Sequence, residues 1–187
     1  MREQLIIGGF GGQGVLLLGE IIARAAIADG KETVCVPAYG PEVRGGFAHS
    51  TVIISDQQIG AVTVSEPDTL IVMNQTSLER FLSQLRQGGW LFVNTSLVEP
   101  PELGAGVVVP LPATEIAEEM GNVRVANSVM LGAYVAGKGV VSEEASLEAL
   151  SSGLRGRAKE LAEMNVIAYR KGLALGLCAA GEGESPR

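Results

Sequence analysis

Residues 9–14 read Gly-Phe-Gly-Gly-Gln-Gly, and they stand between a short apolar run at residues 5–7 and a helical pattern that begins at Val15. A strand, a glycine turn and a helix in this order leave the first N–H groups of the helix without an intrahelical partner, and the helix dipole favours an anion there. Glycine also lets the backbone turn sharply and approach a ligand or another protein closely. The start of this helix is therefore the first place to look for function.

The same glycine spacing satisfies half of the dinucleotide-binding fingerprint, Gly-x-Gly-x-x-Gly between a strand and a helix. The other half is an acidic residue about 20 residues further on, at the end of the next strand, where it holds a ribose hydroxyl. Residues 33–36 form that next strand, and Asp29 and Glu32 lie before it rather than at its end. A tight turn needed only for packing explains the glycines at least as well as NAD binding does.

Composition narrows the class of protein. A length of 187 residues and a hydrophobic content of 47% predict one folded domain. The net charge of −7 argues against nucleic acid or an anionic membrane as a partner. The two cysteines, Cys35 and Cys178, form no CxxC pair, so zinc or iron–sulfur ligation by this chain alone is not expected. The sequence shows neither a signal peptide nor an apolar run long enough to span a bilayer, so we expect a cytoplasmic protein.

Apolar periodicity predicts strands followed by helices, with the helices concentrated in the last third of the chain. Strands are predicted over residues 4–8, 32–37, 69–74, 90–94 and 106–109, and a hairpin over 49–55 and 59–64. Helices are predicted over residues 14–29, 113–120, 126–137 and 155–176. Another helix is predicted to begin at a capping box over residues 76–79 and to end at the glycines 88–89, and a further one to follow an N-cap at Ser142. These elements predict a single three-layer α/β domain over residues 1–176. Its sheet would be mostly parallel with a hairpin insertion, and residues 177–187 would form a disordered tail.

Three further features carry polar groups. The loop over residues 38–46 holds Arg44 beside two glycines and follows the second strand, so it should lie at the same edge of the sheet as the first glycine loop. The Arg44 guanidinium can bind a phosphate or carboxylate, or the loop can be a solvated turn. His49 is the only histidine, and a structural role is favoured over a catalytic one. Asn127 and Ser128 begin an apolar helix, where an N-cap is favoured over a contact with a ligand or partner.

Several segments together resemble the gamma subunit of the 2-oxoacid:ferredoxin oxidoreductases. The matching segments, found in order between residues 4 and 175, are 9–15, 39–46, 50–55, 112–117 and 124–133. Their order is most similar to the type that acts on 2-oxoglutarate or branched-chain 2-oxoacids.

The resemblance implies a multisubunit enzyme that oxidatively decarboxylates a 2-oxoacid with coenzyme A (CoA) and gives an acyl-CoA, carbon dioxide and reduced ferredoxin. Thiamine diphosphate would lie between the alpha and beta subunits, and iron–sulfur clusters in the beta or a delta subunit. This chain would hold no cofactor itself and be inactive alone. It would pack on the catalytic subunits near the approach of CoA, its co-substrate, and reach ferredoxin only through the complex.

No catalytic residue is predicted in this chain. The edge expected to face CoA or a partner subunit consists of Gly11, Gly12, Gln13, Gly14, Arg44, Gly45, Gly46 and Asn127. Two alternatives remain open at this stage: an independent nucleotide- or dinucleotide-binding protein that uses Gly9, Gly11 and Gly14, and a pure assembly module that binds no small molecule.

Overall fold

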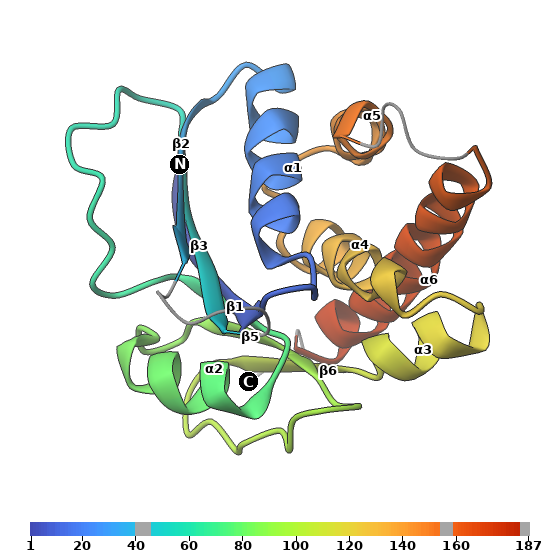
Figure 1. Cartoon of the computed structure of the whole chain (residues 1–187). Coiled ribbons are helices and arrows are strands. Elements are labelled where there is room, and N and C mark those ends of the chain that lie inside the picture. The colour runs from blue at the N-terminus through green and yellow to red at the C-terminus, as the bar shows by residue number, and fades with distance from the viewer. Residues whose placement is uncertain (40–45, 154–158, 184–187) are drawn as a thin grey trace.

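A computed structural model describes residues 1–39, 46–153 and 159–183 (Figure 1). Within these residues six strands form one sheet in the order β2-β3-β1-β4-β5-β6. The strands are β1 (Arg2–Phe10), β2 (Glu32–Tyr39), β3 (Phe47–Ser55), β4 (Thr69–Val72), β5 (Trp90–Asn94) and β6 (Val107–Leu111). Neighbours from β1 through β4 and β5 to β6 are parallel, whereas β3 is antiparallel to both β1 and β2.

Helices cover both faces of this sheet. They are α1 (Val15–Ala28), α2 (Gln75–Phe81), α3 (Ala113–Glu119), α4 (Ala126–Lys138), α5 (Glu143–Gly153) and α6 (Lys159–Gly183), with single 3₁₀ turns η1 (Leu82–Gln84) and η2 (Val123–Val125). In Figure 1, α1, α4, α5 and α6 lie on one side of the sheet and α2 lies on the other. The predicted three-layer α/β domain with a mostly parallel sheet is confirmed.

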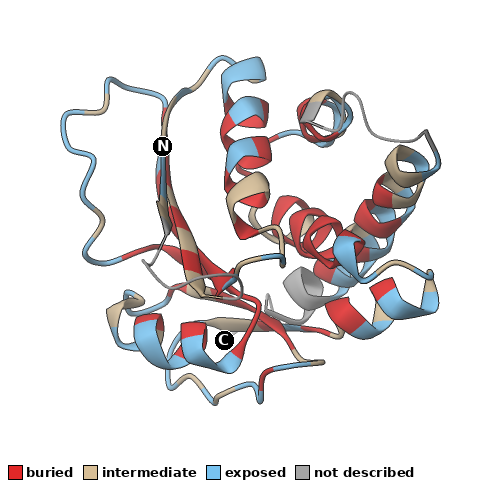
Figure 2. Ribbon diagram, in the orientation of Figure 1, coloured by how far each residue is buried: buried red, intermediate tan, exposed pale blue. Residues whose placement is uncertain are grey.

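The hydrophobic core has two parts, one on each face of the sheet. The larger part packs α1 and α4 against the sheet, with Tyr134 and Phe92 fully buried in it, and the smaller part lies under α2 around Leu78 and Phe81. Figure 2 shows the buried residues along the inner faces of the helices and throughout most of α4. Helix α4 is buried between layers, because α6 covers the side of α4 that the sheet does not.

The hairpin prediction is half wrong. Residues 49–55 lie in β3, but residues 59–64 form no strand. The reason is topological: β1 and β2 already occupy both edges of β3, so no edge is left for a following strand. The segment that was expected to pair instead runs as a mostly exposed connection to β4, with Val62 56% exposed.

Two predicted boundaries also change. Helix α2 is capped by Asn74, whose Oδ1 accepts the Ser77 N–H at 2.9 Å, and not by a box that begins at Thr76, and it gives way to η1 after Phe81. Helix α6 continues to Gly183, so the tail predicted from residue 177 is helical up to that point. The Ser142 cap is confirmed, since its Oγ accepts the Ala145 N–H at 3.1 Å. None of the described helices combines the length and the apolar character needed to cross a membrane.

Candidate functional site

Strands β1 and β4 are parallel neighbours, but their chains leave the sheet in opposite directions. Helix α1 follows β1 onto one face, and α2 follows β4 onto the other. The carboxyl ends of two such strands bound the crevice in which open α/β sheets commonly bind ligands. The glycine loop at residues 11–14 lies at this end of β1, so the fold puts it where the sequence predicted.

The glycine loop turns the chain from β1 into α1. Gly12 and Gly14 have φ angles of 102° and 75°, a region that residues with a Cβ rarely adopt. The first bond of α1 joins the Leu18 N–H to the Gly14 carbonyl at 2.9 Å. The N–H groups of residues 15–17 therefore have no partner within the helix, and Gly14 has no side chain that could cap them. These amides are available to an anion.

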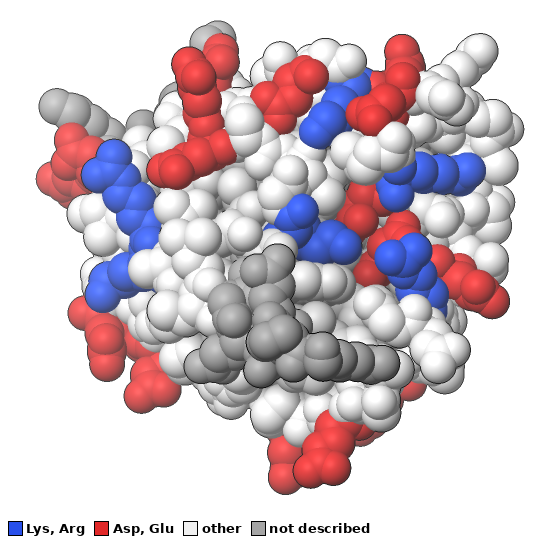
Figure 3. Space-filling view, turned by 180° about the vertical axis from the view of Figure 1, so that it is seen from behind, with Lys and Arg blue, Asp and Glu red and all other residues white. Residues whose placement is uncertain are grey.

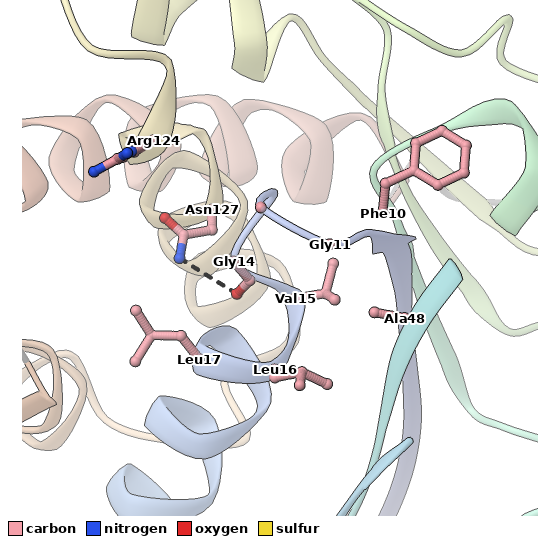
Figure 4. A pocket seen from close by; sticks show the side chains of 10 residues that line it. Phe10, Gly11, Gly14, Val15, Leu16, Leu17, Ala48, Arg124 and Asn127 are labelled. Atoms are coloured by element: carbon pink, nitrogen blue, oxygen red, sulfur yellow. Dashed lines mark hydrogen bonds between the residues drawn. The ribbon is translucent and has the colours of Figure 1, made fainter. Parts of the chain in front are cut away.

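A cavity of about 400 Å³ opens beside these amides. It is lined by Phe10, Gly11, Gly12, Gly14, Val15, Leu16, Leu17, Ala48, Arg124 and Asn127. Figure 4 shows the cavity residues around the start of α1, with Asn127 and Arg124 on the side of α4 and the Phe10 ring turned away from α1. The structure thus brings the glycine loop together with a segment more than 100 residues further along the chain.

Asn127 is not the N-cap that the sequence predicted. Helix α4 begins at Ala126 directly after η2, so Asn127 falls inside the first turn and its side chain is buried, with 4% exposed. Its Nδ2 donates to the Gly14 carbonyl at 3.4 Å, and a Cβ on Gly14 would lie 2.5 Å from that nitrogen. Its Oδ1 is enclosed and has no hydrogen-bond partner among the described residues, which is costly for a buried acceptor.

Arg124 is the lining residue that the sequence analysis missed. It lies in η2, three residues before Asn127, and its side chain is exposed at the edge of the cavity. A guanidinium is the side chain best suited to grip phosphate or carboxylate. It begins the matching segment 124–133, and its position there, three residues before Asn127, is the signal that could have suggested it.

The remaining predicted site residues do not all lie at the cavity. Gln13 does not line the cavity, and its side chain bonds to β1 and to the end of β4 instead. The Gly46 carbonyl accepts the Gly11 N–H at 2.9 Å, which joins the second predicted loop to the first. Arg44 and Gly45 lie outside the described residues.

The other residues considered from the sequence have structural surroundings. His49 packs between the rings of Phe47 and Phe81, with centroid distances of 5.6 and 5.3 Å. Burial, followed by the nearby positive charge of Arg80, lowers the pKa of its imidazole below the usual value. Asp29 accepts from the Ser142 N–H and hydroxyl at 2.6 and 2.7 Å, so this carboxylate is already used far from the glycine loop.

The surface carries both charges in mixture. In the face shown in Figure 3, the described Lys and Arg side chains lie among Asp and Glu side chains and do not merge into one basic surface. This distribution fits the net charge of −7 and gives no support to a nucleic-acid interface on that face.

The fold and the cavity define an α/β domain with a glycine loop of the kind that faces anionic groups. Residues 4–175 match the family described as pyruvate ferredoxin/flavodoxin oxidoreductase. The chain belongs to this family.

Its relatives are of two lengths. The chain is 38% identical to the 2-oxoglutarate synthase subunit KorC of Methanothermobacter marburgensis over 94% of its own length and 97% of that protein. It is 40% identical to the ketoisovalerate oxidoreductase subunit VorA of the same organism, over 82% of its length but 32% of VorA. The chain thus spans about a third of the length of the VorA relative.

The similar solved structures also include one chain of about the same length and one much longer chain. The gamma subunit of a keto/oxoacid ferredoxin oxidoreductase from Geobacter sulfurreducens PCA is 36% identical and superposes with a TM-score of 0.83, covering 96% of this chain and 98% of that one. A 2-oxoglutarate:ferredoxin oxidoreductase from Magnetococcus marinus with 2-oxoglutarate, CoA and succinyl-CoA bound is 26% identical, with a TM-score of 0.87. It covers 95% of this chain, which spans 31% of that longer chain.

Proposed function

We propose that this chain is the gamma subunit of a cytoplasmic 2-oxoacid:ferredoxin oxidoreductase, which converts a 2-oxoacid and CoA to an acyl-CoA and carbon dioxide and passes the electrons to ferredoxin. Support comes from the full-length likeness to KorC and to a gamma subunit, and from the cavity beside the glycine loop. The alpha and beta subunits, and a delta subunit where present, would carry thiamine diphosphate and the iron–sulfur clusters. This chain has only two cysteines, whereas a cluster commonly takes four.

The cavity is proposed to hold a phosphate-bearing segment of CoA. Three groups favour an anion there: the free amides of residues 15–17, the positive end of the α1 dipole, and the guanidinium of Arg124. CoA is an extended molecule with two linked phosphates near its middle, so a cavity of about 400 Å³ would hold that segment while both ends reach the partner subunits. Arg44, Gly45 and Gly46 are proposed to border the same edge.

Arg124→Gln is expected to weaken CoA binding by about 2 kcal/mol, roughly thirtyfold, because it removes a charge-assisted bond. Calorimetric titration of the full chain with CoA and with pyrophosphate at pH 9 measures this effect. Arg170→Gln, on the exposed side of α6, is the matched control for the loss of one charge and should bind like the wild type. CoA affinity that is unchanged in Arg124→Gln would remove the cavity from the proposal.

The role as a subunit has its own test. A tagged copy purified from its source cells is expected to bring down the larger subunits and to support 2-oxoacid-dependent, CoA-dependent dye reduction. The chain purified alone should be folded, colourless and without turnover, since no catalytic arrangement is present among its described residues. Turnover or iron–sulfur absorbance in the isolated chain would contradict the proposal. A complex that works equally well without the chain would contradict it too.

The two alternatives are distinguished by binding. The comparisons fit a gamma subunit and not an independent dinucleotide-binding protein, and Asp29 and Glu32 lie away from where a ribose would be held. A pure assembly module would form the complex normally and bind neither CoA nor pyrophosphate.

A further inference from the structure

The side chain of Gln13 lies at the crevice between the ends of β1 and β4 and bonds to both. Its Oε1 accepts the Phe10 N–H at 2.7 Å, and its Nε2 donates to the Met73 carbonyl at 3.1 Å. The Gln13 N–H also donates to the Phe10 carbonyl at 3.1 Å, so Gln13 bonds to the backbone of Phe10 through both its main chain and its side chain. This is the crevice in which doubly wound sheets commonly hold their ligands.

The bonds of Gln13 continue into a network that ties together the starts of three helices. Asn74, the cap of α2, donates its Nδ2 to Gln13 Oε1 at 3.1 Å. Asn94 donates to the same Met73 carbonyl at 3.3 Å and to Thr114 Oγ1, in α3, at 2.8 Å. The glycine loop is therefore bonded through Gln13 to a buried polar network, and such networks hold their members in one arrangement.

Gln13 also packs directly on the end of β1. A Cβ at Gly9 would lie 2.8 Å from Gln13 Oε1, so the glycine there makes room for this side chain. The open cavity lies against Asn127 and Arg124, and Gln13 is not among the residues that line it.

We propose that Gln13 is a positioning residue: it bonds to the ends of β1 and β4 and holds the glycine loop so that the amides at the start of α1 face the cavity on the α4 side. In this role Gln13 acts through the loop and need not contact CoA itself. What the loop is positioned for rests on the proposed function; that Gln13 holds the loop does not.

The test replaces Gln13 by methionine, which has a similar length and cannot make the two side-chain bonds. Amide hydrogen exchange at Gly11, Gln13 and Leu18, which are the hydrogen-bonded N–H groups of the loop and of the start of α1, is expected to become about tenfold faster in the full chain, and exchange in α4 to stay unchanged. Gln13→Glu keeps the acceptor for Phe10 and Asn74 and loses only the donor to Met73, so its exchange should lie between those of the wild type and Gln13→Met. Gln75→Met is the matched control, because the Gln75 side chain is exposed at the start of α2 and donates to Glu79, far from the glycine loop in sequence.

A second readout uses the assembled complex. The KM for CoA is expected to rise about tenfold in Gln13→Met while kcat stays within about twofold, because the loop is displaced and the chemistry lies on other subunits. Wild-type exchange rates at Gly11, Gln13 and Leu18 of Gln13→Met would overturn the proposal that Gln13 holds the loop. A KM that stays constant while exchange accelerates would overturn the proposal that the loop is held in place for CoA. If the wild-type chain shows no contact with CoA, the proposed CoA site fails by itself, and the exchange comparison still decides the role of Gln13.

Discussion

Gly172→Ala is expected to lower the free energy of unfolding by about 3 kcal/mol or more, and the melting temperature by roughly 6 to 12 °C. Gly172 lies where α6 crosses α4, and a Cβ on it would overlap the carbonyl oxygen of Val129. Gly132 on α4 meets the Tyr169 carbonyl in the same way, and Gly176 would place a Cβ 2.5 Å from the Ala133 carbonyl. Because these are backbone atoms of a rigid helix, the only relief is separation of the two helices.

The control for Gly172→Ala is Gly137→Ala, which makes the same substitution in α4. Its Cβ would meet ring carbons of Trp90 and Phe92 at 3.0 and 3.2 Å, and rings can shift by the few tenths of an ångström required. Both variants gain about 1 kcal/mol in helix propensity from the change of glycine to alanine. This gain offsets the steric cost in Gly137→Ala but not in Gly172→Ala. Thermal melting compares the two variants, and equal stability would show that α6 does not pack on α4 this closely.

The α4–α6 contact also reaches the candidate site. Helix α4 carries Asn127 in its first turn, and Ser128 donates to Asn165 of α6 at 2.6 Å. A displacement of α4 away from α6 would move Asn127 relative to Gly14. The glycine pairs therefore set one wall of the cavity as well as the stability of the domain.

Local sequence patterns were sufficient for the parts of the fold that are locally determined. The strand, glycine turn and helix at residues 5–28 are predictable because the φ angles of Gly12 and Gly14 and the apolar face of α1 are properties of neighbouring residues. The segment at 59–64 shows the limit. Its β-branched residues fit a strand equally well whether or not a partner edge is free, and the partners of β3 come from distant parts of the chain.

The candidate site was half predictable for the same reason. Its glycines lie in one motif, but Arg124 and Asn127 reach the cavity only through the packing of α4 on the sheet. Gln13 was assigned to the loop, but the bonds of its side chain were not predicted. The direction of its side chain depends on Met73 and Asn74, about 60 residues away, whose position no local pattern fixes.

Lys138→Met is expected to lower the free energy of unfolding at pH 7 by about 3 to 5 kcal/mol, the usual cost of leaving one member of a buried ion pair alone. Lys138 Nζ lies 3.2 Å from Glu3 Oε2, and the two side chains are 11% and 6% exposed. The Thr69 hydroxyl donates to the other Glu3 oxygen at 2.6 Å. This pair joins the end of α4 to β1, and without the ammonium the carboxylate keeps only the hydroxyl. Lys138→Arg keeps the charge and should be far milder. Arg24→Met, which breaks an exposed pair with Glu20, should cost at most about 0.5 kcal/mol.

The deficit of Lys138→Met should depend on pH in a defined direction. Burial raises the pKa of Glu3 above its usual value of 4.5, against the lowering effects of Thr69 and Lys138, so loss of the lysine raises it further. An acid whose pKa is raised in the folded state takes up its proton more readily there. The stability that protonated Glu3 contributes is therefore fully present below the pKa of the unfolded chain, and it is lost as the pH rises through the higher pKa of the folded state. Urea unfolding should accordingly show the gap between Lys138→Met and the wild type narrowing as the pH falls from 7 towards 4.5. Glu3→Gln in the same chain should restore much of the stability at pH 7, because a neutral amide needs no cation. A gap that stays constant with pH, or is not reduced by Glu3→Gln, would show that Lys138 stabilises the fold by packing on Trp90, over whose ring it lies at 5.6 Å, and not through Glu3.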